Sequence, residues 1–193
     1  MKDKQLLIAG TGDAAWGYFF LYFDFNLGSI SILPSFVGFV LFYKAIKGLK
    51  ELRRELALLE PLAVLLLVWH LTKWLLSWVG LSLDGLWQPF GLIITLASIY
   101  FHFQFLTDFA ALARQYLPET FLSERILRWR TVQTVIITGV YLMAYVSGFE
   151  SGWLQYVAVG MIVAQLFAMV MLMAALFAMR KEFRNLEYQT EEE

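Results

Sequence analysis

The chain has 193 residues, of which 60% are hydrophobic, 17% are aromatic and only 16% are charged. Soluble domains usually carry about 25% charged residues, so this composition excludes an ordinary water-soluble fold and predicts a membrane protein. The net charge of −1 excludes a global attraction to nucleic acid. The sequence contains no cysteine, which excludes disulfides, zinc–thiolate sites and thiol catalysis.

Six apolar stretches are long enough, or nearly long enough, to cross a bilayer, which takes about 20 helical residues. They cover residues 6–23, 30–46, 61–80, 86–106, 132–146 and 153–179. The sequence therefore predicts an all-α membrane protein with six transmembrane helices in three helical hairpins. We expect one domain over residues 1–182, followed by an acidic and disordered cytoplasmic tail over residues 183–193.

The lysines and arginines predict the orientation of these spans. Two precede the first span, five follow the second, four lie between the fourth and fifth, and three follow the sixth. Fourteen of the fifteen thus gather on one side, whereas the opposite turns carry Asp24, Asp84 and Glu150. The positive-inside rule then places both termini of this multi-pass chain in the cytoplasm.

Two basic segments are expected to lie along the inner membrane surface. Residues 45–59 continue the second span as an amphipathic helix, with leucines on one side and basic residues on the other, which favours attraction to anionic lipid. Residues 119–130, before the fifth span, either do the same or form a solvated basic loop.

One lysine, Lys73, interrupts an otherwise apolar span. Side chains lean toward the N-terminus of their helix, so the Lys73 ammonium leans toward the bilayer centre, on the same face as His70 and Ser77. Asp13 lies at a similar depth in the first span, on a face of small residues where another helix can approach closely. An unpaired charge there costs at least about 2.5–3.5 kcal/mol, so we expect Asp13 and Lys73 to meet.

Other polar residues of the spans can complete a cavity around this pair. Polar stripes run along the fourth span through Thr95, Ser98 and His102, and along the fifth through Thr134 and Tyr141. The expected ligand-binding residues are Asp13, Trp16, His70, Lys73, Trp74, Tyr141 and Gln165. A structural ion pair with interhelical hydrogen bonds is the alternative, and no catalytic residue, metal site or cofactor is expected.

The hairpin over residues 22–52 carries a recurring pattern: acid, x, Asn, x, Gly, followed by Leu-Pro-x-Phe-x-Gly and a basic helix end. It maps onto eight residues, namely Asp24, Asn26, Gly28, Leu33, Pro34, Phe36, Gly38 and Lys44. In this pattern the chain resembles a family of small Gram-positive bacterial integral membrane proteins. The resemblance covers about the first quarter of the chain, and it implies a membrane location without implying an activity.

In its size and number of spans the chain is also similar to the substrate-binding subunits of energy-coupling-factor vitamin transporters, although no vitamin-specific motif is present.

Three functions remain open. The first is a small-solute transporter, or the membrane-embedded substrate-binding subunit of one, with a polar intramembrane site.

The alternative is a non-catalytic membrane partner, such as an assembly, regulatory or immunity-type protein, in which the Asp13–Lys73 pair is structural. An intramembrane enzyme with His70 or His102 as base is the third, but no set of nucleophile, base and orienting group can be recognised. Expected partners are the lipid bilayer, a small polar solute, and a membrane protein or a second copy of the chain.

Overall fold

The computed structural model describes residues 2–23, 26–27, 30–31, 34–81, 88–147 and 152–191. Within these ranges the chain is helical apart from one short hairpin of two antiparallel strands, β1 (Asn26–Leu27) and β2 (Ile30–Ser31). A 3₁₀ helix, η1 (Arg54–Leu59), precedes the third α-helix. The six α-helices are α1 (Lys2–Tyr22), α2 (Phe36–Leu49), α3 (Glu60–Trp78), α4 (Gln88–Tyr116), α5 (Leu122–Ser147) and α6 (Gly152–Glu191).

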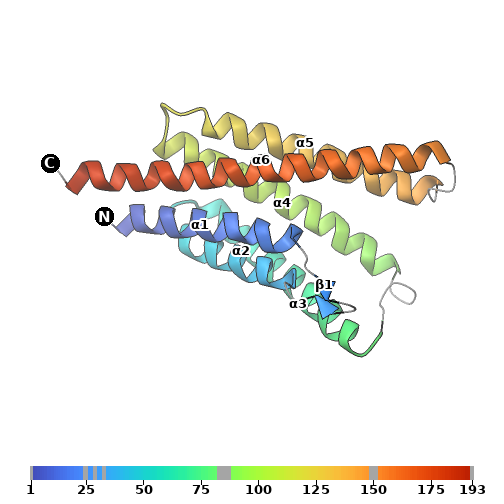
Figure 1. The fold of residues 1–193 in the computed structure, drawn as a ribbon. Coiled ribbons are helices and arrows are strands. Elements are labelled where there is room, and N and C mark those ends of the chain that lie inside the picture. Colours follow the sequence, from blue (N-terminus) through green and yellow to red (C-terminus); the bar gives the residue numbers. More distant parts are fainter. Residues whose placement is uncertain are drawn as a thin grey trace.

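The helices form one elongated bundle in which each helix packs on the next in the chain, and α6 closes the arrangement by packing on α1. The start of α1 and the end of α6 lie at the same end of the bundle (Figure 1). At the opposite end α3 and α4 diverge from the α5–α6 pair (Figure 1). Contacts between α3 and α4 are correspondingly sparse.

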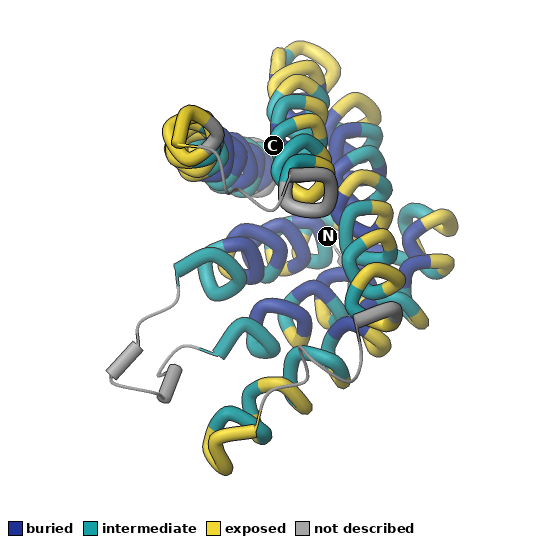
Figure 2. Tube along the Cα trace, turned by 90° about the vertical axis from the view of Figure 1, so that its right-hand side faces the viewer, coloured by how far each residue is buried: buried dark blue, intermediate teal, exposed yellow. Residues whose placement is uncertain are grey.

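Three helical segments are long and apolar enough to cross a membrane: Arg54–Trp78, Phe90–Tyr116 and Gln155–Leu186. Exposed residues lie along the outer faces of the bundle (Figure 2), and many of them are large and apolar, for example Val159 and Phe167 on α6, each 59% exposed. Such a surface is stable in lipid and unfavourable in water. The prediction of a helical membrane protein is therefore confirmed.

The count of six spans and the orientation of the termini stay predictions. All six expected segments contain an α-helix, but within the part of the chain that the structure describes only three of these helices meet the requirements for a span. The second expected span differs most, because Ile30 and Ser31 lie in β2 and α2 begins at Phe36. The 14 residues of α2 rise by only about 21 Å at 1.5 Å per residue.

The structure also differs from the sequence-based expectation at the three segments that were placed outside the spans. Residues 45–59 are not one surface helix: α2 ends at Leu49, η1 begins at Arg54, and Leu49, Leu56 and Leu59 are buried in the core. Residues 122–130 form the first turns of α5, and α6 continues through the expected tail to Glu191. In each case tertiary packing of apolar side chains favours the longer or more buried arrangement.

The dense part of the core lies in the half of the bundle that contains the termini. Fully buried aromatic rings of α2 and α4 pack against one another there, with 5.2 Å between the ring centroids of Phe42 and Phe105 and 4.6 Å between those of Phe105 and Phe109. Leu172 and Leu176 of α6 are also fully buried. The half toward the diverging ends of α3 and α4 is less tightly packed. It contains a cavity that is described below as the central cavity.

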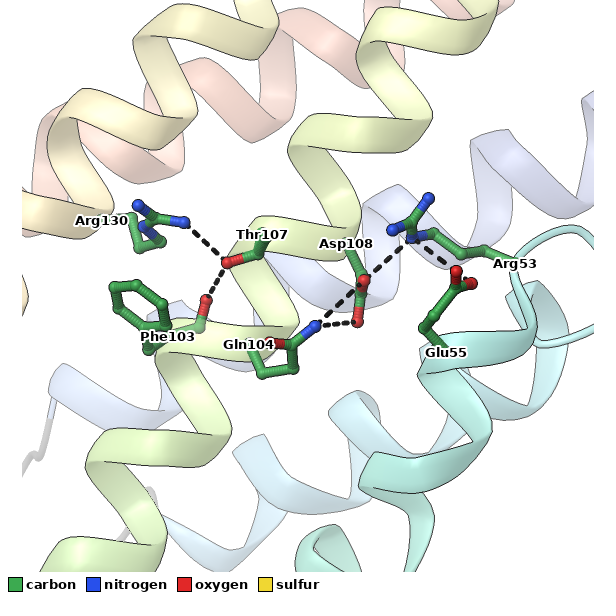
Figure 3. Close-up of polar contacts among 7 residues, drawn as sticks. All are labelled: Arg53, Glu55, Phe103, Gln104, Thr107, Asp108 and Arg130. Carbon is green, nitrogen blue, oxygen red and sulfur yellow. Dashed lines mark hydrogen bonds and ion pairs between the residues drawn. The ribbon is translucent and has the colours of Figure 1, made fainter.

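A buried ion pair fixes η1 against α4 (Figure 3). Arg53 donates a hydrogen bond from Nε to Oδ1 of Asp108 at 2.8 Å, and the Asp108 side chain is fully buried. Gln104, one turn earlier on α4, donates from its amide to both carboxylate oxygens at 3.3 Å. Glu55 approaches the same guanidinium at 3.9 Å but is largely exposed.

The closest helix pair, α1 and α2, meets through glycines. A Cβ atom on Gly38 would lie 2.7 Å from the backbone oxygen of Gly17, and one on Gly17 would lie 2.6 Å from the Phe42 ring. The prediction that the small-residue face of α1 admits another helix closely is confirmed. Because the partner atom at Gly38 belongs to the backbone, a side chain there can be accommodated only if the two helices separate.

We expect Gly38→Ala to destabilise the protein by about 1–3 kcal/mol, the usual cost of overpacking. Gly48→Ala is the matched control on the same helix, since a Cβ atom there meets nothing within 4 Å, and it should be neutral or stabilising by up to about 1 kcal/mol. Unfolding of the purified variants in mixed micelles measures both. Equal stabilities would contradict the close α1–α2 approach.

Candidate functional site

A cavity between the helices, called the central cavity below, has a volume of about 500 Å³. Its lining comes from five helices: the end of α1, the second half of α3, the first half of α4, the middle of α5, and α6. The residues that line it are Leu21, Tyr22, Trp69, His70, Lys73, Gly91, Ile94, Thr95, Ser98, Ile99, His102, Leu106, Gln133, Thr134, Ile137, Tyr141 and Gln165.

The central cavity lies near the middle of the three candidate spans. The midpoints of Arg54–Trp78 and Phe90–Tyr116 are Leu66 and Phe103, so His70 and His102 lie within about 6 Å of them along the helix axes. Gln165 is a similar distance from the centre of the third span. In a bilayer these polar groups would therefore lie at the depth of the hydrocarbon.

His102 is a buried polar residue of the lining and is only 9% exposed. Its Nδ1 lies 3.2 Å from the hydroxyl of Tyr18 on α1. The rings of Phe39, Phe42 and Phe101 surround it, with centroids 5.2–6.0 Å from that of the imidazole. His102 is thus held in one orientation by a hydrogen bond and by aromatic packing.

Two further hydrogen bonds orient side chains of the lining. His70 Nδ1 lies 2.9 Å from Oγ of Ser35. Because Ser35 does not line the cavity, this hydrogen bond orients the imidazole from outside the cavity. Gln133 of α5 donates from its amide to the hydroxyl of Tyr22. These bonds join α2 to α3 and α1 to α5, and they fix polar groups before any ligand arrives.

Gln165 contributes an amide whose nitrogen and oxygen are both buried and make no hydrogen bond of ordinary geometry with any described residue, although the side chain also interacts with the Tyr22 hydroxyl. Burying an unpaired amide costs about 1–3 kcal/mol in proteins. A buried polar group of this kind calls for a partner such as water or a bound solute.

One charged side chain, Lys73, lines the cavity among the described residues. Lys73 is exposed, as is Tyr141, whereas His102 and Gln133 are buried, so the cavity is open on the side of Lys73 and Tyr141 and closed on the side of His102 and Gln133. Between them Thr95 and Ser98 contribute hydroxyl groups from α4. The lining thus combines one cation with neutral donors and acceptors, and none of its described residues carries a carboxylate.

Four of the seven residues expected at the site line this cavity: His70, Lys73, Tyr141 and Gln165. The polar stripe of α4, which ends at His102, lines it as well. These residues come from four different helices and meet in space as expected from their places in the sequence.

Asp13 is not brought to the cavity. The cations that act on its carboxylate are Lys44 of α2 and Arg180 of α6, and the Arg180 guanidinium packs against Gly12, 3.1 Å from where a Cβ atom would lie. The expected meeting of Asp13 with Lys73 is therefore corrected. Asp13 lies on α1 within reach of charges from α2 and α6, whereas Lys73 lines the central cavity.

The two tryptophans expected at the site also lie elsewhere. Trp16 is 45% exposed and packs edge-on against Phe177 of α6. Trp74 packs between Phe36 and Trp78 at centroid distances of 5.3 and 5.1 Å. Trp69, one turn before Lys73, is the tryptophan that lines the cavity.

Gln133 and Tyr22 also line the cavity, although neither was expected there from the sequence. Gln133 had a usable signal, because an amide at the start of an apolar segment, eight residues from Tyr141, lies on nearly the same helix face. Tyr22 had none, since a tyrosine at a helix end is typical of the membrane interface. Among the residues that the structure describes, no group of three or more histidines, cysteines or acids is placed to hold a metal ion.

Comparison of the chain with protein-family models, curated proteins and solved structures found no match. The class of protein therefore follows from the fold and the cavity alone. They define a helical membrane protein with a cavity between its helices, lined in part by polar side chains.

Proposed function

We propose that this protein is a multi-pass protein of a bacterial cytoplasmic membrane that binds a small polar solute in the central cavity, as a transporter or as the membrane-embedded binding subunit of one. The observation that carries the proposal is a cavity of about 500 Å³, at mid-span depth, into which five helices direct polar side chains. Polar residues inside a membrane are costly, and a gathered set of them is typical of a solute site.

The proposed topology is six spans with both termini in the cytoplasm. It is supported by the common end at which α1 begins and α6 ends (Figure 1), and by the basic residues that follow α2 and α6. The short helix α2 is compatible with this topology because α1 and α3 flank it, and locally thin or protein-shielded segments are tolerated in membranes.

The lining favours a solute that carries hydrogen-bond acceptors. Lys73 offers a positive charge at the open end, and Gln133, Gln165 and the α4 hydroxyls offer neutral donors. Trp69 and Tyr141 add flat aromatic surfaces. Because no described lining residue is acidic, a small carboxylate or an uncharged polar molecule fits better than a cation.

A solute screen tests the proposal. Purified protein is heated with small carboxylates, amino acids, nucleosides and amines, each as a pair of charged and uncharged analogues. A ligand at one hundred times its dissociation constant stabilises a protein by about 2.7 kcal/mol, which raises the melting temperature by several degrees. We expect stabilisation by an acceptor-bearing solute and none by amines. Stabilisation by amines alone, or by no solute in the panel, would count against this function.

A non-catalytic membrane partner is the second candidate, and the position of Asp13 favours it. The Asp13 carboxylate is attracted by Lys44 of α2 and Arg180 of α6 and does not line the cavity, as expected for a charge that serves helix packing. In this case the charges serve helix packing, and the partner would dock on the exposed apolar face of α6. Retention of one stoichiometric protein partner, with no solute bound, distinguishes it from the first candidate.

A further inference from the structure

A second cavity, of about 520 Å³, lies between the first turns of α5 and the middle of α6. Its lining consists of Phe121, Leu122, Glu124, Arg125, Arg128, Trp129 and Met171. It is separate from the central cavity, with which it shares no lining residue. We call it the arginine pocket.

The arginine pocket presents two guanidinium groups to its surroundings. Arg125 and Arg128 are three residues apart, so they project from the same face of α5, and both are exposed. Neither makes an ion pair or a side-chain hydrogen bond with any described residue. Glu124 also lines the pocket, which leaves a net charge of +1, and its carboxylate can accept hydrogen bonds from hydroxyl groups.

An apolar surface continues directly from the pocket toward the membrane centre. The Trp129 ring packs edge-on against Phe167 at a centroid distance of 5.6 Å. Beyond it, Val163, Leu166 and Phe167 of α6 and Val135 of α5 are between 47% and 65% exposed. Their spacing along α6 places them on one face, so a strip of exposed apolar side chains leads away from the arginines.

This combination matches the two parts of a phospholipid. A phosphate fits two arginines because guanidinium groups form paired, charge-assisted hydrogen bonds with its oxygens. Acyl chains fit the apolar strip above. A soluble anion would gain nothing from that strip, nor from Phe121, which is 82% exposed at the edge of the pocket.

We infer that the arginine pocket binds the headgroup of an anionic phospholipid, with its acyl chains lying along α5 and α6. This places the pocket at the headgroup level of the membrane face where α5 begins. The inference is independent of any solute in the central cavity.

Lipid titration of the purified full-length chain in a neutral detergent tests the inference, with bound lipid counted by native mass spectrometry. The probes are phosphatidylglycerol and phosphatidylcholine with identical acyl chains. Two basic residues near the membrane surface favour an anionic lipid, so the wild type should prefer phosphatidylglycerol by at least about tenfold. Equal binding of the two lipids would overturn the inference.

The double variant R125Q/R128Q should lose this preference. The control R114Q/R184Q removes the same charge from two exposed arginines of α4 and α6 outside the pocket, and it should keep the preference. Met171→Trp fills the pocket from α6 while leaving both arginines in place, and it should also weaken binding. If R125Q/R128Q does not fold, the lipid preference of Met171→Trp tests the inference instead.

Unchanged preference in both pocket variants would overturn the inference, as would an equal loss in R114Q/R184Q, which would indicate a diffuse charge effect. Inorganic phosphate at millimolar concentration should not displace the lipid. If it does, the pocket is a site for soluble anions, and the assignment to a phospholipid is wrong.

Discussion

Asp108→Ala should lower the free energy of unfolding by about 3 kcal/mol. Removing one partner of a buried ion pair costs about 3–5 kcal/mol, because the remaining charge is left without compensation. The lower value applies here because the Arg53 side chain keeps 24% of its surface exposed, while that of Asp108 is fully buried. The variant also removes both acceptors of the Gln104 amide. Unfolding with sodium dodecyl sulfate in mixed micelles measures the change.

Two further variants separate the pair from its surroundings. Glu55 lies 3.9 Å from the same guanidinium but is 55% exposed, so Glu55→Ala should change stability by less than about 1 kcal/mol. The double variant R53M/D108L should recover much of the loss, because apolar side chains often replace a buried pair without cost. A small effect of Asp108→Ala, equal to that of Glu55→Ala, would contradict the buried pair.

Ser98→Trp should abolish solute binding, with a loss of at least about hundredfold, equivalent to about 2.7 kcal/mol. Ser98 lines the central cavity midway between its open end and His102, and an indole there occupies the space where the solute lies. The variant should still fold, because the new ring enters existing space. The measurement is titration calorimetry with whichever solute stabilises the wild type.

Leu96→Trp is the matched control, two residues away on α4. Leu96 is 58% exposed and does not line the cavity, so its indole faces outward and binding should be unchanged. Loss of binding in both variants would indicate general damage to α4. Unchanged binding in Ser98→Trp would place the solute site elsewhere.

The helices and part of the site could be predicted from the sequence for one physical reason. Apolar runs must be buried or face lipid, and a polar residue within them must avoid lipid. His70, Lys73, Tyr141 and Gln165 therefore converge on one cavity, although they are far apart in the chain. The position of a residue along its helix, and the helix face on which it lies, both follow from the local sequence.

The relative rotation and neighbours of the helices are not encoded locally, and the errors follow from this. Asp13 has the expected depth, yet α1 turns that side toward Lys44 and Arg180. Trp16 and Trp74 pack on neighbouring rings outside the cavity for the same reason. Asp108 follows the expected end of the fourth span at residue 106, but α4 continues to Tyr116 and Arg53 pairs with Asp108.

If the central cavity takes up a polar solute, it must hold water at the depth of the hydrocarbon, while the outer faces of the bundle contact lipid. The sequence contains no cysteine, so an introduced cysteine is the sole thiol of the protein. A water-soluble methanethiosulfonate reagent reacts with the thiolate, which requires water. Ser98→Cys lines the cavity, and Leu96→Cys lies on the outer face of the same helix.

The decisive measurement is the rate at which this reagent labels the two variants in intact membranes. We expect Ser98→Cys to react at least about tenfold faster than Leu96→Cys, although Leu96 is the more exposed position in the bundle. Fast labelling of Leu96→Cys together with an unreactive Ser98→Cys would mean a dry interior and an outer face in water, and it would contradict the account.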